Sequence, residues 1–321
     1  MDSMPYLIAE VGFNHEGDMD CARRMIRAAA DSGVDAVKFQ TYRAIDIALP
    51  SSPHFAAIGM GEMDIAQHRM LKAETDACGV AFLSTPFSVW AVDLLEEVGV
   101  GRYKIASMDV SNPVLLRRVA STGKPVILST GMATLAEIAG AVEVLREAGA
   151  GEIALLHCIS KYPAATEDLN LAAIARLKEV FGLVTGYSDH YPGIEACFAA
   201  AVAGADIIET HFTLDNTLTT ADHSHSATPA QLVELRERLT LLRAMLGNPD
   251  VNDRLDAANA AIFRRGVYAA RDIAPGAVVT EEDILLCRPP TSLTPHDALR
   301  LPGLRSEAGM AQYAPFSLRK V

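Results

Sequence analysis

Two strand-like segments of the sequence each carry a histidine at or near their C-terminal end. They are residues 186–190, Gly-Tyr-Ser-Asp-His, and residues 209–213, Glu-Thr-His-Phe-Thr. Side chains just past the C-terminal ends of barrel strands face the active site, so His190 and His211 can share one metal ion. Imidazole nitrogens suit Mn, Fe, Zn or Co. A single histidine there is more often a hydrogen-bonded structural residue, but two, each with a carboxylate nearby (Asp189, Glu209), favour a metal site.

Polar side chains close the other strand-like segments as well. They include Glu10, Lys38, Gln40, Thr85, Lys104, Ser107, Asp109, Ser129 and Ser188. Taken singly, Glu10 can belong to a structural ion pair, and the two lysines can be solvated at the rim. Together, two lysines with hydroxyls and backbone amides near a helix start suit a phosphate and a carboxylate. We therefore expect a phosphorylated carboxylic acid as substrate.

Strand-length apolar runs alternate with helical stretches about eight times. The expected strands are Tyr6–Val11, Ala36–Gln40, Ala81–Ser84, Arg102–Ala106, Pro125–Ser129, Glu152–His157, Leu183–Tyr187 and Asp206–His211, and Ala-rich segments with three- and four-residue periodicity include Met19–Ser32, Ala133–Ala148, Ile194–Ala203 and Pro229–Leu246. Parallel strands joined by helices eight times over predict an α/β fold, a (β/α)₈ TIM barrel, with a doubly wound sheet as the alternative.

The domain boundaries follow from changes in this rhythm. Residues 1–247 are expected to form the barrel domain, 248–262 a linker, and 263–321 a small β-rich domain. The segment Thr41–Gly61, with its prolines and serines, predicts a long loop over the barrel mouth. The last sixty residues are near the lower limit for an independent core, so we expect this domain to use a partner surface.

The composition and the cysteine spacing argue against several classes of protein and of structural site. A formal net charge of −12 argues against a general nucleic-acid binder, because phosphate neutralisation needs a basic face. The 5 cysteines are scattered without a CxxC pair, so neither a disulfide framework nor a zinc knuckle is predicted. With no segment of membrane-spanning length and no leader-like start, we expect a soluble, cytoplasmic protein with no membrane partner.

Ordered motifs along the chain resemble the N-acetylneuraminate (sialic acid) synthase family. They are Ile8–Asp18, Val37–Gln40, Ser84–Phe87, Tyr103–Ser107, Leu128–Met132, Leu156–Cys158 with Tyr162-Pro163, Gly186–His190 and Glu209–Leu214. The resemblance extends to the C-terminal segment, which is similar to that family's antifreeze-like (SAF) domain. Because the matches fall on every expected barrel strand, they are specific.

The resemblance implies a phosphoenolpyruvate-dependent transferase, which condenses this substrate with an N-acetylated amino sugar such as N-acetylmannosamine to a nine-carbon 2-keto-3-deoxy acid and phosphate. It implies a divalent metal ion, first Mn²⁺ and otherwise Mg²⁺ or Co²⁺, on His190 and His211. It places phosphoenolpyruvate at Lys38, Thr85, Lys104, Ser107, Ser129, Ser160 and Ser188, and the sugar at Gln40, Tyr162, Asp222 and, from the antifreeze-like domain of a second subunit in a domain-swapped homodimer, Arg288. Glu10, Asp109 and Glu209 are the candidate catalytic carboxylates.

Some positions depart from the family pattern. Asp109 replaces a longer glutamate, Ser160 stands where many members carry asparagine, and the segments Thr217–His225 and Pro290–Pro295 differ where the sugar would be recognised. His223 and His225 are either extra ligands or, as we expect, residues of a mobile polar loop. Two alternative functions follow: another phosphoenolpyruvate-dependent 3-deoxy-ulosonate synthase with a different aldose, or a catalytically degenerate sugar-binding protein.

Overall fold

Eight parallel strands form the sheet of the first part of the chain. The structure, a computed structural model, describes residues 4–247 and 256–317, which divide into two compact units at Leu246/Gly247. The strands are β1 (Tyr6–Glu10), β2 (Ala36–Thr41), β3 (Ala81–Pro86), β4 (Tyr103–Ile105), β5 (Val126–Ser129), β6 (Ile153–Cys158), β7 (Val184–Asp189) and β8 (Ile207–His211). Each lies within two residues of its predicted bounds.

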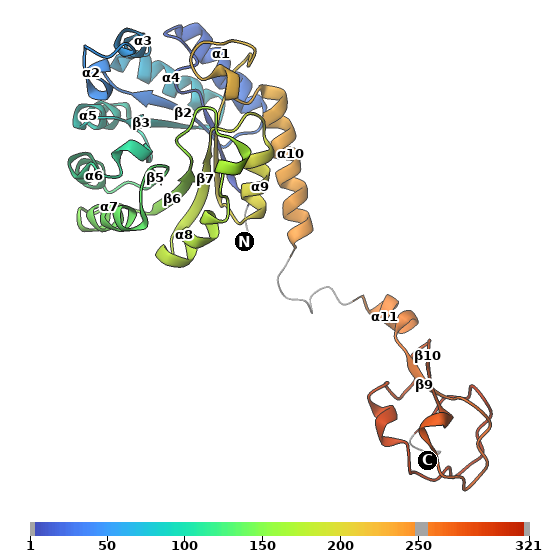
Figure 1. Cartoon of the computed structure of the whole chain (residues 1–321). Coiled ribbons are helices and arrows are strands. Elements are labelled where there is room, and N and C mark those ends of the chain that lie inside the picture. The colour runs from blue at the N-terminus through green and yellow to red at the C-terminus, as the bar shows by residue number, and fades with distance from the viewer. Residues whose placement is uncertain (1–3, 248–255, 318–321) are drawn as a thin grey trace. The chain divides into compact units, whose positions relative to one another are not determined.

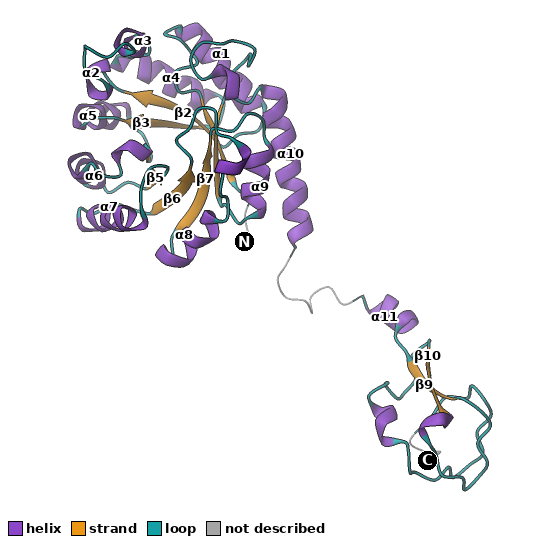
Figure 2. Cartoon of the chain, viewed as in Figure 1, coloured by secondary structure: helices purple, strands orange, loops and turns teal. Residues whose placement is uncertain are grey.

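The strands close into the predicted (β/α)₈ barrel. Their order is β3-β2-β1-β8-β7-β6-β5-β4, every pair is parallel, and β3 also contacts β4. The helices surround the strands (Figures 1 and 2). They are α1 (Met19–Asp31), α4 (Ile65–Ala77), α5 (Val89–Val98), α6 (Pro113–Ala120), α7 (Leu135–Glu147), α8 (Ala173–Phe181), α9 (Glu195–Val202) and α10 (Pro229–Leu246).

Local sequence sets the helix ends. Asp18 and Thr134 accept hydrogen bonds from the first-turn amides of α1 and α7, which stabilises those N-termini. Gly99 ends α5 with a φ of 83°, a left-handed conformation that favours glycine. Because all eight strands run parallel, their carboxyl ends open into one common mouth.

The core has two layers. Inside the barrel, alternate strand residues pack together, among them Ile8, Leu83 and Ile207, and a larger apolar layer fills the space between strands and helices. Gly186 on β7 permits a close approach of β8, because a Cβ there would lie 2.2 Å from the carbonyl oxygen of Ile207. The strand ends are thereby held on a tightly packed frame.

The segment Thr41–Gly61 is not the irregular loop that its prolines and serines predict. It contains two short helices, α2 (Ala44–Ile47) and α3 (Phe55–Gly59). Asp46 accepts hydrogen bonds from the backbone and side chain of Arg43, and Ala44 donates its amide to Glu62. Local capping therefore orders a segment that has no helical periodicity.

The second unit forms its own core around a β hairpin. Strands β9 (Gly266–Ala269) and β10 (Ile284–Cys287) pair antiparallel, and Val267, Val279 and Phe316 are fully buried. Helix α11 (Ala257–Phe263) occupies most of the described part of the predicted linker, while residues 248–255 lie outside the described residues. The sequence did not predict this helix, which Asp256 caps by accepting the Asn259 amide; the linker bounds stay a prediction. The antifreeze-like assignment stays a prediction.

Among the described residues, no helix is long and apolar enough to cross a membrane.

Candidate active site

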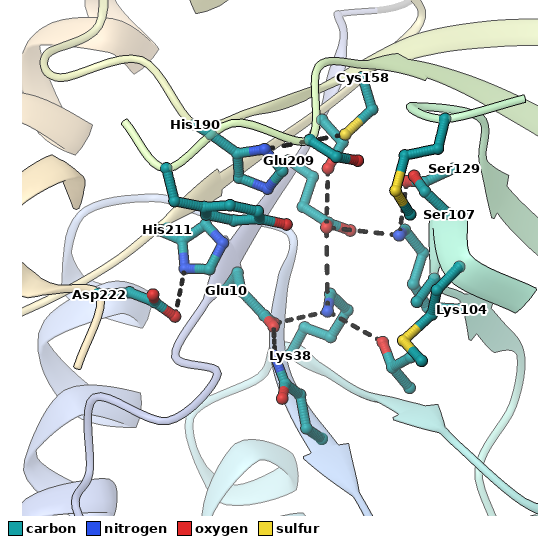
Figure 3. A pocket seen from close by; sticks show the side chains of 18 of the residues that line it. Glu10, Lys38, Lys104, Ser107, Ser129, Cys158, His190, Glu209, His211 and Asp222 are labelled. Carbon is teal, nitrogen blue, oxygen red and sulfur yellow. Dashed lines mark hydrogen bonds and ion pairs between the residues drawn. The ribbon is translucent and has the colours of Figure 1, made fainter. Parts of the chain in front are cut away.

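A cavity of about 450 Å³ opens where the barrel strands end (Figure 3). Every strand contributes to its wall either directly or through the residues that follow it. The lining residues are Glu10, Lys38, Gln40, Thr85, Phe87, Lys104, Ala106, Ser107, Met108, Ser129, Met132, Cys158, Ser160, Tyr162, Ser188, His190, Glu209, His211 and Asp222. This wall places cations, carboxylates, hydroxyls and imidazoles within one site.

A buried ion pair lies at the base of the cavity. Lys38 Nζ on β2 is 2.7 Å from Glu10 Oε2 on β1, and it donates a hydrogen bond to Thr85 Oγ1 over 3.0 Å. Gln40 Nε2 donates to the other Glu10 oxygen over 3.0 Å. Because neighbouring parallel strands pair Glu10 with Lys38 in register, the sheet itself brings the two charges together.

A second lysine and carboxylate complete the network. Lys104 Nζ donates to Ser129 Oγ over 2.7 Å and lies 3.5 Å from Glu209 Oε1, which also lies 3.8 Å from Lys38 Nζ. Ser188 Oγ donates to the same Glu209 oxygen over 3.2 Å. Glu209 Oε2 is buried without a hydrogen-bond partner. The two lysines and two glutamates therefore share one enclosed space, as Figure 3 shows.

The buried charges shift one another's protonation. Burial raises the pKa of Glu10 to about 7, against the opposing effect of Lys38. Burial also favours the neutral form of Glu209, but Lys104 and Lys38 together lower the pKa of that carboxyl. Burial lowers the pKa of Lys104, and Glu209 opposes this shift. Glu10 is thus the carboxyl able to gain or lose a proton near neutral pH.

His190 and His211 lie side by side across the cavity from this network. Their ring centroids are 5.2 Å apart, and both rings pack against Tyr162. Burial lowers the pKa of His190 to about 4 and that of His211 well below its usual value, so both rings are neutral. His190 Nδ1 lies 2.7 Å from the Ile159 carbonyl oxygen, which accepts its proton and leaves Nε2 with a free lone pair. A neutral imidazole oriented in this way fits a divalent metal ion.

A third histidine joins this pair from the loop after β8. His225 belongs to a short 3₁₀ helix, His223–His225, and its ring centroid is 5.1 Å from that of His211. Asn14 Oδ1 accepts the amide proton of Asp222, and Asn14 Nδ2 donates to Ser226 Oγ, so the loop is tied to the segment after β1. The expectation that His223 and His225 lie in a mobile polar loop is wrong, because both side chains are buried.

Most of the predicted site residues line the cavity. They are Glu10 and Glu209, then Lys38, Thr85, Lys104, Ser107, Ser129, Ser160 and Ser188, then Gln40, Tyr162 and Asp222, and the pair His190 and His211. Their roles stay predictions.

Two predicted site residues lie elsewhere. Asp109 does not line the cavity: it is buried, and its Oδ1 accepts a hydrogen bond from Asn112 Nδ2 over 2.9 Å. The 3₁₀ turn Ser107–Asp109 directs Ser107 and not Asp109 to the cavity.

Arg288 belongs to the second unit, where its guanidinium lies 5.2 Å from the ring centroid of Phe263. Asp189 also turns away from the cavity, since it accepts hydrogen bonds from Tyr187 and Tyr191.

Sequence reasoning missed the apolar part of the wall. Phe87, Met108, Met132 and Cys158 line the cavity, and Cys158 Sγ lies 3.8 Å from His190 Nδ1. Phe87, Met132 and Cys158 belong to motifs on which the family resemblance rests. Their place in those motifs was the signal that could have identified them as wall residues. For His225 the signal was its spacing, two residues after a second histidine on a strand-end loop.

Comparisons with known proteins agree on one family. The NeuB family profile matches residues 25–250. The N,N'-diacetyllegionaminic acid synthase of Campylobacter jejuni is 37% identical over 305 residues, 90% of this chain and 91% of that protein. The human N-acetylneuraminate-9-phosphate synthase is 33% identical over 258 residues, 76% and 72% of the two chains. The crystal structure of N-acetylneuraminic acid synthetase from Leptospira borgpetersenii, in complex with citrate, is 37% identical with a TM-score of 0.77, covering 80% of this chain and 90% of that one.

Proposed function

The chain belongs to the NeuB family, and we propose that it condenses phosphoenolpyruvate with the aldehyde of an N-acetylated amino sugar. The products are a nine-carbon 2-keto-3-deoxy acid and inorganic phosphate. The observation that carries this proposal is one cavity in which two buried lysines face a pair of neutral histidines. Relatives named as synthases of sialic-acid type make the chain a transferase of this class.

Phosphoenolpyruvate binds at the lysine side of the cavity. Lys38 and Lys104 supply the positive charge that the overall net charge of −12 does not. Hydroxyls of Thr85, Ser129 and Ser188 already contact these lysines or Glu209, and Ser107 and Ser160 line the same wall. Because the two glutamates balance the two lysines, an incoming anion competes with Glu10 and Glu209 for the ammonium groups.

The reaction forms a carbon–carbon bond and breaks a carbon–oxygen bond. C3 of phosphoenolpyruvate adds to the aldehyde carbon, water adds to C2, and the bond from C2 to the phosphate oxygen breaks as phosphate leaves. A divalent ion, Mn²⁺ or alternatively Co²⁺ or Mg²⁺, held by His190 and His211 would supply Lewis-acid polarisation of the aldehyde oxygen. Glu10 accepts the proton of the attacking water, since its pKa of about 7 matches a general base at neutral pH. Lys38 and Lys104 stabilise the leaving phosphate.

The acceptor is a neutral sugar. Gln40 and Tyr162 line the same cavity and offer an amide and a phenol to hydroxyls. A phosphorylated acceptor needs a second set of cations, and among the described residues that line this cavity Lys38 and Lys104 are the only Lys or Arg side chains. Arg43 and Lys161, the basic residues of nearby loops, are paired with Asp46 and Asp168.

The second unit completes the sugar site of a partner subunit in a homodimer. Arg288 carries this proposal, because a guanidinium can donate several hydrogen bonds to ring hydroxyls and an acetamido carbonyl. Mixing an Arg288→Ala subunit with a His190→Ala subunit, each inactive alone, should restore part of the activity if each site uses both chains. Full activity of a monomer at assay concentration in sedimentation would exclude this arrangement.

The experiment for the reaction is phosphate release with phosphoenolpyruvate, Mn²⁺ and a panel of aldoses. We expect release only when a neutral N-acetylated hexosamine is present, and none from a His190→Ala variant. Release with arabinose 5-phosphate or erythrose 4-phosphate alone would favour another 3-deoxy-ulosonate synthase. Sugar binding without phosphate release would identify a degenerate sugar-binding protein.

A further inference from the structure

The loop after β8 carries a histidine, His225, that lies beside His211 and Asp222, two residues of the cavity wall. His225 is 5% exposed, and its Nε2 is buried without a hydrogen-bond partner. His211 is 7% exposed, and its Nδ1 is likewise buried without one. A buried polar nitrogen that lacks a partner is unfavourable unless a ligand satisfies it. The two nitrogens lie on neighbouring rings, so one bound ligand can satisfy both.

A carboxylate stands between the two nitrogens. Asp222 Oδ2 lies 3.5 Å from His211 Nδ1, and Asp222 Oδ1 lies 3.9 Å from His225 Nε2. Each of the three side chains has a ligand atom within 4.8 Å of those of the other two. Two ligand atoms at right angles around an ion about 2.1 Å away are about 3 Å apart, so small side-chain adjustments close the observed set around an ion.

We propose that Asp222 and His225 extend the divalent-metal site of His190 and His211, with His211, Asp222 and His225 as its two-histidine, one-carboxylate face. His225 comes from the loop that distinguishes this chain, where Thr217–His225 departs from the family pattern. A set with two imidazoles suits Mn²⁺, Fe²⁺ or Co²⁺ better than Mg²⁺, which prefers oxygen ligands. The inference deepens the proposed function and rests on it only for the role of the ion in turnover.

His223 provides a matched control within the same turn. It is 4% exposed, two residues from His225, but its Nδ1 is 2.6 Å from Thr213 Oγ1 and it lines a different cavity, with Glu16. Loss of its ring perturbs the same 3₁₀ helix without touching the three proposed ligands. His225→Phe removes both nitrogens and retains an aromatic ring against Tyr162, whose centroid is 5.7 Å from that of His225.

The test is an equilibrium Mn²⁺ titration of the full chain without substrates, following the electron paramagnetic resonance signal of free Mn²⁺. We expect at least tenfold weaker binding in His225→Phe and in His225→Ala, and unchanged binding in His223→Ala, with all variants folded by circular dichroism. Pulsed resonance on the bound ion should lose the coupling of one imidazole nitrogen in His225→Phe. If His225→Phe binds Mn²⁺ as tightly as wild type, if His223→Ala weakens binding equally, or if the nitrogen couplings are unchanged, the proposal is wrong. Since no substrate is present, these results are independent of whether the condensation takes place.

Discussion

Replacing Lys38 with Met should destabilise the barrel by an amount that increases with pH. Lys38 and Glu10 are buried 2.7 Å apart, and burial raises the pKa of the carboxyl from 4.5 to about 7 although the ammonium opposes this shift. Breaking a buried ion pair costs about 3–5 kcal/mol. Without Lys38, the pKa of Glu10 rises further, and protonation of the carboxyl removes the unpaired charge at low pH.

The sign follows from proton binding. A carboxyl whose pKa is higher in the folded state than in the unfolded state holds its proton in the folded protein, so stability falls as pH rises between those two values. In the wild type this fall ends near pH 7, whereas in Lys38→Met it continues above pH 7. One pKa unit corresponds to about 1.4 kcal/mol, so the variant should lose up to that amount relative to wild type between pH 7 and pH 8.

Urea unfolding at pH 6, 7 and 8 measures this difference. Trp90, the only tryptophan, lies on α5 in the barrel, so its fluorescence reports on barrel unfolding. Combining Lys38→Met with Glu10→Gln removes the titrating carboxyl and should abolish the extra pH dependence. An equal loss of stability in Lys38→Met at all three pH values would refute the reasoning, as would the same pH dependence in the double variant.

Three further predictions concern activity. In the wild type, kcat/KM should rise with pH through an inflection near 7 as Glu10 loses its proton. Glu10→Gln should lose this pH dependence and about 10²-fold or more in rate. A Gln variant with the wild-type pH profile would exclude Glu10 as the base. Lys104→Met should raise the KM for phosphoenolpyruvate at least tenfold, because Lys104 is one of only two cations that line the described cavity; an unchanged KM in steady-state kinetics would contradict this. Chelation should abolish turnover, and added Mn²⁺ should restore it in wild type but not in His211→Ala. Full activity of the chelated wild type would show that the reaction needs no metal ion.

The barrel and most of the cavity wall follow from sequence because both depend on strand periodicity. Each strand is a short apolar run, and the residue that closes it, such as Lys38 or His211, must lie at the barrel mouth. Asp109, a predicted catalytic carboxylate, does not line the cavity, because the position after a strand does not fix side-chain direction and the 3₁₀ turn there directs the carboxylate to Asn112.

Other features depend on contacts that no local pattern contains. The burial of His225 rests on Asn14, whose side chain bonds to Ser226 across 212 positions of the sequence. Helix α2 rests on the bond from the Ala44 amide to Glu62, in a segment whose prolines and serines predict a loop. A raised pKa for Glu10 also cannot be read from sequence, because it arises from burial and from the nearby Glu209 charge, which outweigh the opposing effect of Lys38.

The most direct test of the central claim is mass spectrometry of the products made from phosphoenolpyruvate labelled with ¹³C at all three carbons, in the presence of Mn²⁺ and neutral N-acetylated hexosamines. The account predicts a nine-carbon keto acid that carries all three labelled carbons, formed in equal amount to the phosphate released. Phosphate release that leaves the label in pyruvate, with none joined to a sugar, would contradict it.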